Sequence, residues 1–127
     1  MIVLDASVLI AHLEASDLHH DRATDLLVDA ADEPFGISPL TLAEVLVGPA
    51  RSGKLDAAQK AIRELGVAAV ALSEQAPARL AAMRASTRLR LPDCCVLLAA
   101  ETAQAQVATF DDRLAAAAAD LGLLVRS

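Results

Sequence analysis

The chain has 127 residues, of which 55% are hydrophobic and 2% aromatic, and its formal net charge is −6 at pH 7. This length suits one ordinary domain, and the hydrophobic share is large enough for a real core. With no Trp or Tyr and two Phe, the composition argues against base stacking on aromatic side chains and against an aromatic ligand cage.

The N-terminal half predicts two short strands, each followed by a pair of helices. The expected strands are Ile2–Leu4 and Phe35–Ser38, and the expected helices are Ala6–Glu14, Leu18–Ala31, Pro39–Val47 and Leu55–Leu65. Ser38 precedes Pro39, which suits an N-cap followed by proline at the first helical position. Asp17 is expected to cap the second helix, and Gly48-Pro49 to end the third.

The C-terminal half continues the alternation. The expected strands are Val67–Leu72, Gln106–Phe110 and Leu123–Val125, and the expected helices are Ser73–Arg88, Asp93–Ala105 and Asp112–Ala119. Short apolar strands that alternate with helices indicate a parallel sheet covered on both faces. We therefore expect a single α/β domain over residues 1–127, with about five parallel strands flanked by helices.

No targeting or membrane segment is expected. No apolar stretch reaches the roughly 20 residues that a membrane span needs, and the N-terminus lacks the basic region of a signal peptide. Cys94 and Cys95 are adjacent, so they cannot form an ordinary structural disulfide and do not have the spacing of metal ligands. A reducing cytoplasm fits these features.

The charge is distributed unevenly along the chain. Residues 1–48 contain nine acidic residues and one basic residue, whereas residues 49–92 contain three acidic and eight basic ones, and residues 93–127 five acidic and two basic ones. The basic segment is either a set of solvated helix faces or an electropositive rim beside an acidic centre.

Four acidic residues stand where the local pattern does not favour an acid. Asp5 and Asp111 each follow a predicted strand, Glu44 is embedded in an apolar helix pattern, and Asp93 opens an apolar helix. Burying an unpaired carboxylate costs several kcal/mol, and no Lys or Arg adjoins Asp5, Glu44 or Asp93. The economical explanation is that the four carboxylates converge on one or two divalent cations.

The predicted sheet allows this convergence. Ligands of open parallel sheets bind beyond the carboxyl ends of the strands, where Asp5 and Asp111 are expected. Glu44 lies about one and a half turns into its helix, and Asp93 begins another, so both can face the same crevice. Mg²⁺ or Mn²⁺ would relieve the mutual repulsion of these carboxylates, and such a site suits phosphodiester hydrolysis.

Each acid also has a simpler explanation: Asp5 as a helix N-cap, Glu44 as an exposed helix residue, Asp93 as an acid favoured by the helix dipole, and Asp111 as a turn residue. All four of these explanations would have to hold at once, in an order that also fits one crevice.

The remaining reactive side chains, the histidines and cysteines, have ordinary structural interpretations. The histidines are expected to be ordinary surface or partly buried residues, and the cysteines small residues in or near the core. They are His12, His19, His20, Cys94 and Cys95.

Four segments carry a resemblance to a known family. They are Asp5-Ala-Ser-Val-Leu-Ile, Ser38-Pro-Leu-Thr-Leu-Ala-Glu-Val-Leu-Val-Gly, Leu91-Pro-Asp and Ala108-Thr-Phe-Asp. Taken together and in this order, they resemble PIN-domain ribonucleases, and most closely the VapC toxins of bacterial and archaeal VapBC toxin–antitoxin pairs. The resemblance covers essentially the whole chain.

The resemblance implies a three-layer PIN-like fold and Mg²⁺- or Mn²⁺-dependent endoribonuclease activity. The catalytic metal ligands it implies are Asp5, Glu44, Asp93 and Asp111. Ser7 and Thr109 match supporting hydroxyl groups. Because Asp112 directly follows Asp111, the sequence leaves open which of the two faces the metal and which caps the next helix.

The resemblance also implies partners. These are an RNA substrate, a small antitoxin that blocks the site, and a second copy of the chain, with a heterotetramer or larger assembly formed with the antitoxin. An Arg-rich antitoxin segment would suit an acidic cleft. Arg88 and Arg90 closely precede Asp93 and are predicted to hold the RNA backbone beside the cleft.

Competing functions fit less well. A phosphatase with an aspartyl nucleophile needs a second acid two residues after Asp5, where Ser7 stands, and a late lysine, whereas the only lysines are Lys54 and Lys60. A receiver-type signalling domain needs an acidic pair near the first strand and a lysine near the end, and neither is present. A catalytically weak module that holds an antitoxin and co-represses an operon is the alternative, although the presence of all four acids argues against a dead site.

Overall fold

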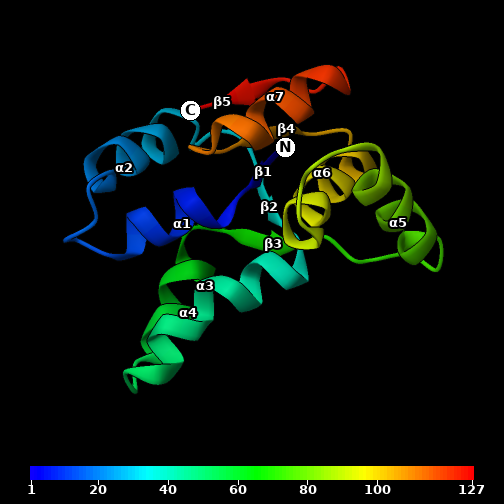
Figure 1. Ribbon diagram of the computed structural model, residues 1–127. Helices are drawn as coiled ribbons and strands as arrows, with labels where there is room; N and C mark the ends of the chain where they lie inside the picture. The colour runs from blue at the N-terminus through cyan, green and yellow to red at the C-terminus, as the bar shows by residue number, and fades with distance from the viewer.

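The computed structural model describes all 127 residues and has a five-stranded parallel sheet at its centre (Figure 1). The strands are β1 (Ile2–Leu4), β2 (Phe35–Ile37), β3 (Val67–Ala69), β4 (Gln106–Ala108) and β5 (Val125–Arg126). Their order across the sheet is β3-β2-β1-β4-β5. The seven helices are α1 (Ala6–Leu13), α2 (His20–Asp29), α3 (Pro39–Arg51), α4 (Leu55–Glu64), α5 (Ala76–Ser86), α6 (Leu91–Ala103) and α7 (Asp112–Asp120). The predicted fold class and order of elements are confirmed.

The side chains of the central strand show why both faces of the sheet are covered. Successive strand residues point to opposite faces, and Ile2, Val3 and Leu4 are all fully buried. Ile2 and Leu4 belong to a core packed by α1 to α4, whereas Val3 belongs to a second core packed by α5, α6 and α7. A continuous apolar run in β1 therefore requires the three-layer arrangement.

Helix α3 is longer than the sequence predicted. It continues through Gly48 and Pro49 to Arg51, so the expectation that Gly48-Pro49 ends it is wrong. A residue before proline avoids the helical region mainly because its side chain and amide clash with the proline ring. Gly48 has no side chain to clash, and Pro49 loses only the single backbone hydrogen bond that its missing N–H would donate to the Val45 carbonyl.

Other boundaries also differ by a few residues. Helix α5 begins at Ala76 rather than Ser73, since Pro77 lacks an N–H and fits the first turn. It ends at Ser86, where the Thr87 hydroxyl donates to the Met83 carbonyl at 2.7 Å. Asp17 accepts a hydrogen bond from the His19 amide in the turn before α2, which begins at His20.

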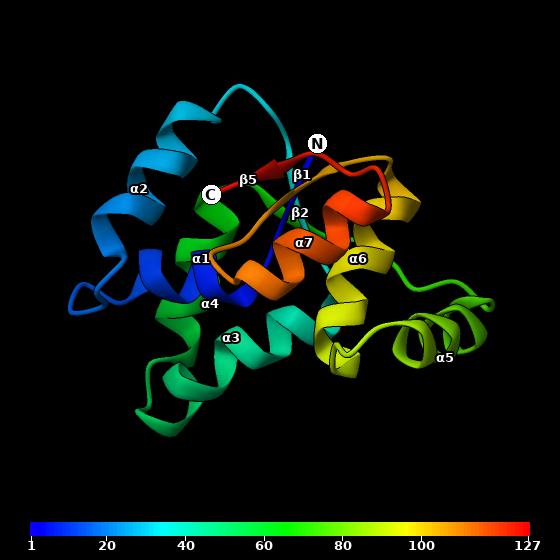
Figure 2. The ribbon, with the colours of Figure 1, turned by 45° about the horizontal axis from the view of Figure 1, so that its top comes forward.

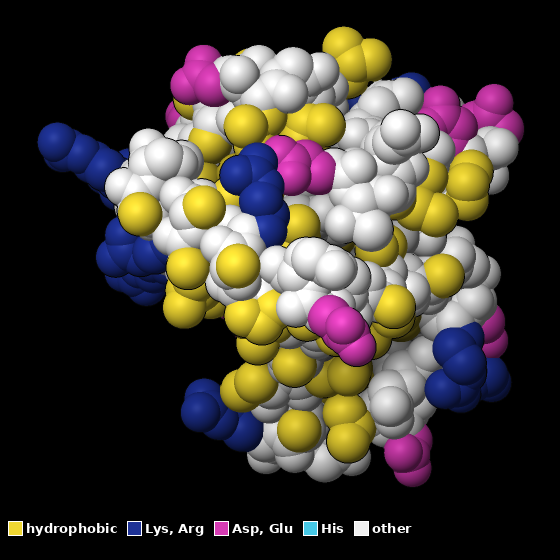
Figure 3. All heavy atoms as spheres, turned by 90° about the vertical axis from the view of Figure 1, so that its right-hand side faces the viewer, with side chains coloured by type: hydrophobic (Ala, Val, Ile, Leu, Met, Phe, Trp, Pro, Cys, Tyr) yellow, Lys and Arg dark blue, Asp and Glu magenta, His cyan; other side chains and the backbone are white.

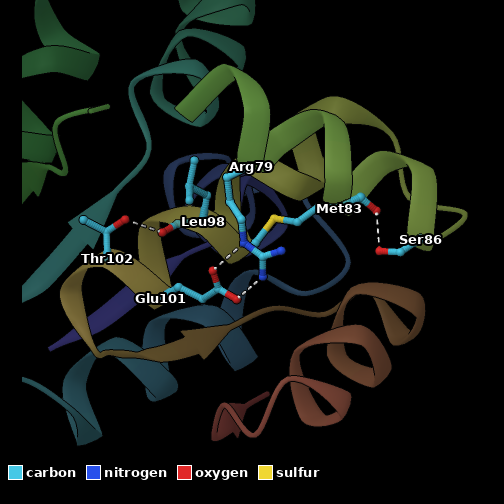
Figure 4. Close-up of polar contacts among 6 residues, drawn as sticks. All are labelled: Arg79, Met83, Ser86, Leu98, Glu101 and Thr102. Carbon is cyan, nitrogen blue, oxygen red and sulfur yellow. Dashed lines mark hydrogen bonds and ion pairs between the residues drawn. The ribbon is translucent and has the colours of Figure 1, made fainter. Parts of the chain in front are cut away.

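Figure 3 shows the side of the molecule that lies to the right in Figure 1, where hydrophobic side chains are spread over the surface. An ion pair joins α5 to α6. The Arg79 guanidinium donates through Nη2 to Glu101 Oε1 at 2.7 Å and through Nε to Oε2 at 3.2 Å (Figure 4). The hydrogen bond to Glu101 is the main reason that the pKa of Arg79 is raised. Two-point pairing fixes how α5 lies against the helix that carries Asp93.

The topology brings several chain segments to the carboxyl end of β1. Strands β2 and β4 lie on opposite sides of β1, so the connections that leave the carboxyl ends of these strands run in different directions. Such a switch point in the strand order opens a crevice at that end of the sheet. Helices α1, α3, α6 and α7 surround this end of the central strand (Figure 2). No helix of the structure has the length and apolar character needed to cross a membrane.

Candidate metal centre

Asp5 is a buried carboxylate fixed by three donors. The residue is 8% exposed and follows β1 directly. Oδ1 accepts a hydrogen bond from the Ala6 amide at 2.8 Å, and Oδ2 accepts from Ser7 Oγ and from Thr109 Oγ1, each at 2.7 Å. Asp5 is thus the N-cap of α1, as its simpler explanation proposed, but two hydroxyl groups from different segments also converge on it.

The same two hydroxyls hold the loop after β4. Thr109 Oγ1 accepts from the Asp111 amide at 3.0 Å, and Ser7 Oγ accepts from the Phe110 amide at 3.1 Å. A hydroxyl can donate one hydrogen bond and accept others, so each side chain connects Asp5 to the backbone that carries Asp111. The parallel pairing of β1 with β4 makes this connection between distant parts of the chain possible.

Asp111, rather than Asp112, caps helix α7. Asp111 Oδ1 accepts from the amides of Arg113 at 2.8 Å and Leu114 at 3.1 Å, whereas Asp112 is the exposed first residue of the helix. The alternative in which Asp112 is the cap is therefore wrong. Only one oxygen of Asp111 makes these capping bonds, so the other has no partner within the chain.

Glu44 and Asp93 lie close enough to the other carboxylates to be affected by their charges. The pKa of Glu44 is raised by partial desolvation, and further by the charges of Asp5 and Asp93. The pKa of Asp93 is raised by partial desolvation, then by Asp5 and Asp111, while the backbone and charge of Arg90 oppose the increase. Asp5 and Asp111, which cap α1 and α7, therefore interact electrostatically with Glu44 of α3 and Asp93 of α6 as one group.

A cavity of about 340 Å³ lies at this group of acids. Glu44, Asp93 and Asp111 line it, together with Arg88, Leu89, Arg90, Pro92 and Arg113. The predicted RNA-binding residues Arg88 and Arg90 thus lie beside three of the four predicted ligands. No three acidic, His or Cys side chains are close enough together to hold a metal ion as they stand. The donors are nevertheless hard carboxylate oxygens, the ligands that fit Mg²⁺ and Mn²⁺.

The histidine and cysteine side chains make packing and hydrogen-bond contacts within the fold. His12 Nδ1 lies 2.9 Å from Thr24 Oγ1, and the His12 ring stacks on His20 with centroids 6.2 Å apart, so these side chains join α1 to α2. Burial and the nearby His20 lower the pKa of His12. Cys94 and Cys95 are buried in α6, as predicted.

Sequence reasoning missed two arginines near the acidic group. The guanidinium carbon of Arg22 lies 4.3 Å from the centre of the Phe110 ring, so α2 contacts the loop between Thr109 and Asp111. As the single basic residue among residues 1–48, Arg22 carried a signal in the charge distribution. Arg113 lines the cavity, and its position two residues after Asp111 was the available signal.

Comparisons with known proteins agree on a family. The sequence model of the PIN domain matches residues 2–120. Ribonuclease VapC29 of Mycobacterium tuberculosis is 41% identical over 59 residues, which cover 46% of this chain and 44% of that protein. The match thus spans less than half of the curated relative's length.

Solved structures share the fold. Rickettsia felis VapBC2, bound to a DNA fragment from its promoter, has a TM-score of 0.75 at 17% identity and covers 99% of this chain and 98% of its own. FitAcB from Neisseria gonorrhoeae has a TM-score of 0.74 at 21% identity and covers 100% of this chain and 97% of its own. At such identities the likeness concerns the fold alone.

Thr109→Val tests the hydroxyl that joins Asp5 to Asp111. Valine has the same shape but removes both hydrogen bonds of a buried hydroxyl, so we expect the free energy of unfolding to fall by about 1–3 kcal/mol in urea denaturation. Thr102→Val is the matched control, since its exposed hydroxyl only contacts the Leu98 carbonyl within α6. The control should change stability by less than about 0.5 kcal/mol. Equal effects of the two substitutions would contradict a special role for Thr109.

Glu44→Gln tests the desolvation and the crowding of carboxylates that raise the pKa of Glu44. Because the pKa of Glu44 is raised in the folded state, its favourable contribution is complete at pH values below its usual pKa and is lost as the pH rises through the folded value. In EDTA the variant should therefore be more stable than the parent chain at about pH 7, and this gain should vanish near about pH 4. Urea denaturation at both pH values measures the gain, with Glu74→Gln as an exposed control. A variant that is less stable than the parent at neutral pH would contradict the raised pKa of Glu44.

Proposed function

Because the chain belongs to the PIN-domain family, we propose that it is a metal-dependent endoribonuclease that acts as the toxin of a toxin–antitoxin pair. The proposed reaction is the hydrolysis of RNA phosphodiester bonds at the cavity beside Asp5. One observation carries the proposal: carboxylates from four separate segments meet at the carboxyl end of the central strand, where partial desolvation and then their mutual charges raise the pKa of Glu44 and Asp93. Local sequence alone does not require this arrangement.

We propose that Asp5, Glu44, Asp93 and Asp111 hold Mg²⁺ or Mn²⁺. When bound, the cation would supply a water of lowered pKa and stabilise negative charge on the reacting phosphate. Ser7 and Thr109 would support the site because both donate to Oδ2 of the Asp5 carboxylate. Asp111 is preferred over Asp112 as the ligand because it lines the cavity.

The positive charges of the cavity support an RNA substrate. Arg88 and Arg90 lie in the segment just before α6 and line the cavity with the carboxylates. Guanidinium groups bind phosphate oxygens through paired hydrogen bonds, so these residues would hold the RNA backbone next to the metal ligands. The formal net charge of −6 does not oppose this, since the local balance at the cavity differs from that of the whole chain.

A groove next to the cavity supports an antitoxin partner. It has a volume of about 620 Å³ between α1, α3 and α4. Its apolar side chains include Ile10, Leu13, Val45, Ala57, Ala58 and Ala61. Glu44 lines both this groove and the cavity. We propose that the apolar face of an antitoxin helix occupies the groove and that an arginine of the antitoxin reaches Glu44, which would block the metal centre.

Several further expectations belong to this proposal. The chain would form a homodimer, and a heterotetramer or larger assembly with its antitoxin, as the resemblance implies. The cytoplasm is its proposed place of action, because that is where a toxin would meet cellular RNA. Residues 1–127 are proposed to form one domain.

A second candidate function is a binding module that holds the antitoxin and represses its own operon with little catalysis. The observation in its favour is that no three Asp, Glu, His or Cys side chains lie close enough together to hold one metal ion in the present arrangement. Metal-dependent cleavage distinguishes it from the leading proposal.

The first test is cleavage of total cellular RNA by the purified chain with Mg²⁺, Mn²⁺ or EDTA. We expect discrete fragments that require the divalent cation. Asp93→Asn should reduce the rate by at least about 100-fold, because even indirect partners of metal ligands contribute 10–100-fold. Asp120→Asn, at the exposed end of α7, is the matched control and should cleave normally. Metal-independent cleavage would contradict the mechanism, and the absence of both cleavage and metal binding would favour the binding module.

The groove is tested with a synthetic amphipathic peptide that has leucines along one face and an arginine at one end. The peptide should bind the chain and inhibit cleavage. Ala58→Glu places a charge in the groove, so it should weaken binding of the peptide by at least about tenfold, equivalent to 1.4 kcal/mol, while RNA cleavage stays normal. Gln59→Glu adds the same charge to α4 outside the groove and should bind the peptide as the parent chain does. Equal peptide affinities for both variants would remove the groove from the interface.

A further inference from the structure

Three arginines share the cavity with the carboxylates without forming ion pairs. Arg88 and Arg90 come from the segment before α6, and Arg113 from the first turn of α7. Elsewhere Arg79, Arg126 and Lys60 pair with glutamates at 4.0 Å or less, but none of the three cavity arginines has an acidic partner within that distance. Their guanidinium groups are therefore available to an anion from outside the chain.

The backbone fixes Arg113 beside a proposed metal ligand. Its amide donates to Asp111 Oδ1 at 2.8 Å, and the Leu114 amide donates to the same oxygen. Since this carboxylate already occupies the amide groups at the start of α7, the helix end itself offers few free donors to an anion. Recognition of an anion at this corner of the cavity therefore depends on the Arg113 side chain.

The net formal charge of the cavity depends on whether a cation is bound. Glu44, Asp93 and Asp111 balance the three arginines, and the neighbouring Asp5 leaves one excess negative charge. A divalent cation would turn this into one excess positive charge. Because interactions at such short range are strong in a partly desolvated site, the change in sign would decide whether a phosphate is repelled or attracted.

We propose that Arg113, together with Arg88 and Arg90, forms a phosphate subsite for the RNA strand next to the scissile bond, and that this subsite attracts RNA strongly only when the carboxylates hold a divalent cation. The inference rests on the proposed ribonuclease function and adds a residue and an order of binding to it. Arginine suits this role because its planar group donates to two phosphate oxygens at once.

Binding of a labelled single-stranded RNA, followed by fluorescence anisotropy at several salt concentrations, tests the subsite. Ca²⁺ replaces Mg²⁺, and electrophoresis verifies that the RNA stays intact. Arg113→Ala should weaken binding and lower the slope of log Kd against log salt by about 0.7, the value for one phosphate contact with a single strand. Arg63→Ala removes the same charge from an exposed site on α4 outside the cavity and should leave the slope unchanged. Arg113→Lys keeps the charge and should retain most of the slope.

The order of binding is tested by replacing Ca²⁺ with EDTA, which should weaken RNA binding by the parent chain several-fold. An unchanged salt slope in Arg113→Ala, or equal RNA affinity in Ca²⁺ and EDTA, would overturn the proposal. Arg113→Gln and thermal unfolding of each variant separate loss of the contact from loss of the fold. A parent chain that cleaves RNA while Arg113→Ala keeps its slope refutes only the subsite. A parent chain that neither binds nor cleaves RNA with any cation refutes the ribonuclease function, and the subsite with it.

Discussion

A carboxylate buried at the end of the central strand constrains the whole site. Asp5 cannot leave water without hydrogen-bond donors, and the Ala6 amide, Ser7 and Thr109 supply them. Thr109 is available only because β4 pairs with β1 in parallel register. The same hydroxyls then receive the amides of the loop after β4, so satisfying one carboxylate also fixes the backbone of Asp111. Fold stability and site geometry therefore depend on the same few hydrogen bonds.

Glu44 and Asp93 have fewer hydrogen-bond donors around their carboxylates than Asp5 has. Glu44 is largely exposed on α3, Asp93 is half-buried in the first turn of α6, and both have raised pKa values. The protein thus tolerates partly desolvated and mutually repelling carboxylates at the crevice, where few of its own donors stabilise their charges. Such stored repulsion is typical of functional sites, because a ligand of opposite charge recovers the lost free energy on binding.

Opposite charges lie side by side in the cavity without neutralising each other by direct contact. The carboxylates and the arginines come from different elements, and the ion pairs that the fold does form lie elsewhere, as between Arg79 and Glu101. This separation gives the site two sets of groups, one suited to cations and one to anions. Groups of both kinds within one cavity suit the proposed reaction at a phosphodiester held by a metal ion. The adjoining apolar groove shares Glu44 with the cavity.

The sequence by itself determined the order of elements, the parallel sheet and the segments that carry the acids. These follow from local rules: apolar β-branched runs form buried strands, and helical periodicity marks the elements between them. It did not determine that α3 passes through Pro49, that Asp111 rather than Asp112 caps α7, or that Arg113 joins the cavity. The first two outcomes depend on neighbouring residues, Gly48 before Pro49 and the Arg113 and Leu114 amides after Asp111, but the pattern allowed either alternative. The third depends on contacts between residues far apart in the chain, which no local pattern encodes. Strand order decided which side chains meet, because only the pairing of β1 with β4 brings Thr109 to Asp5.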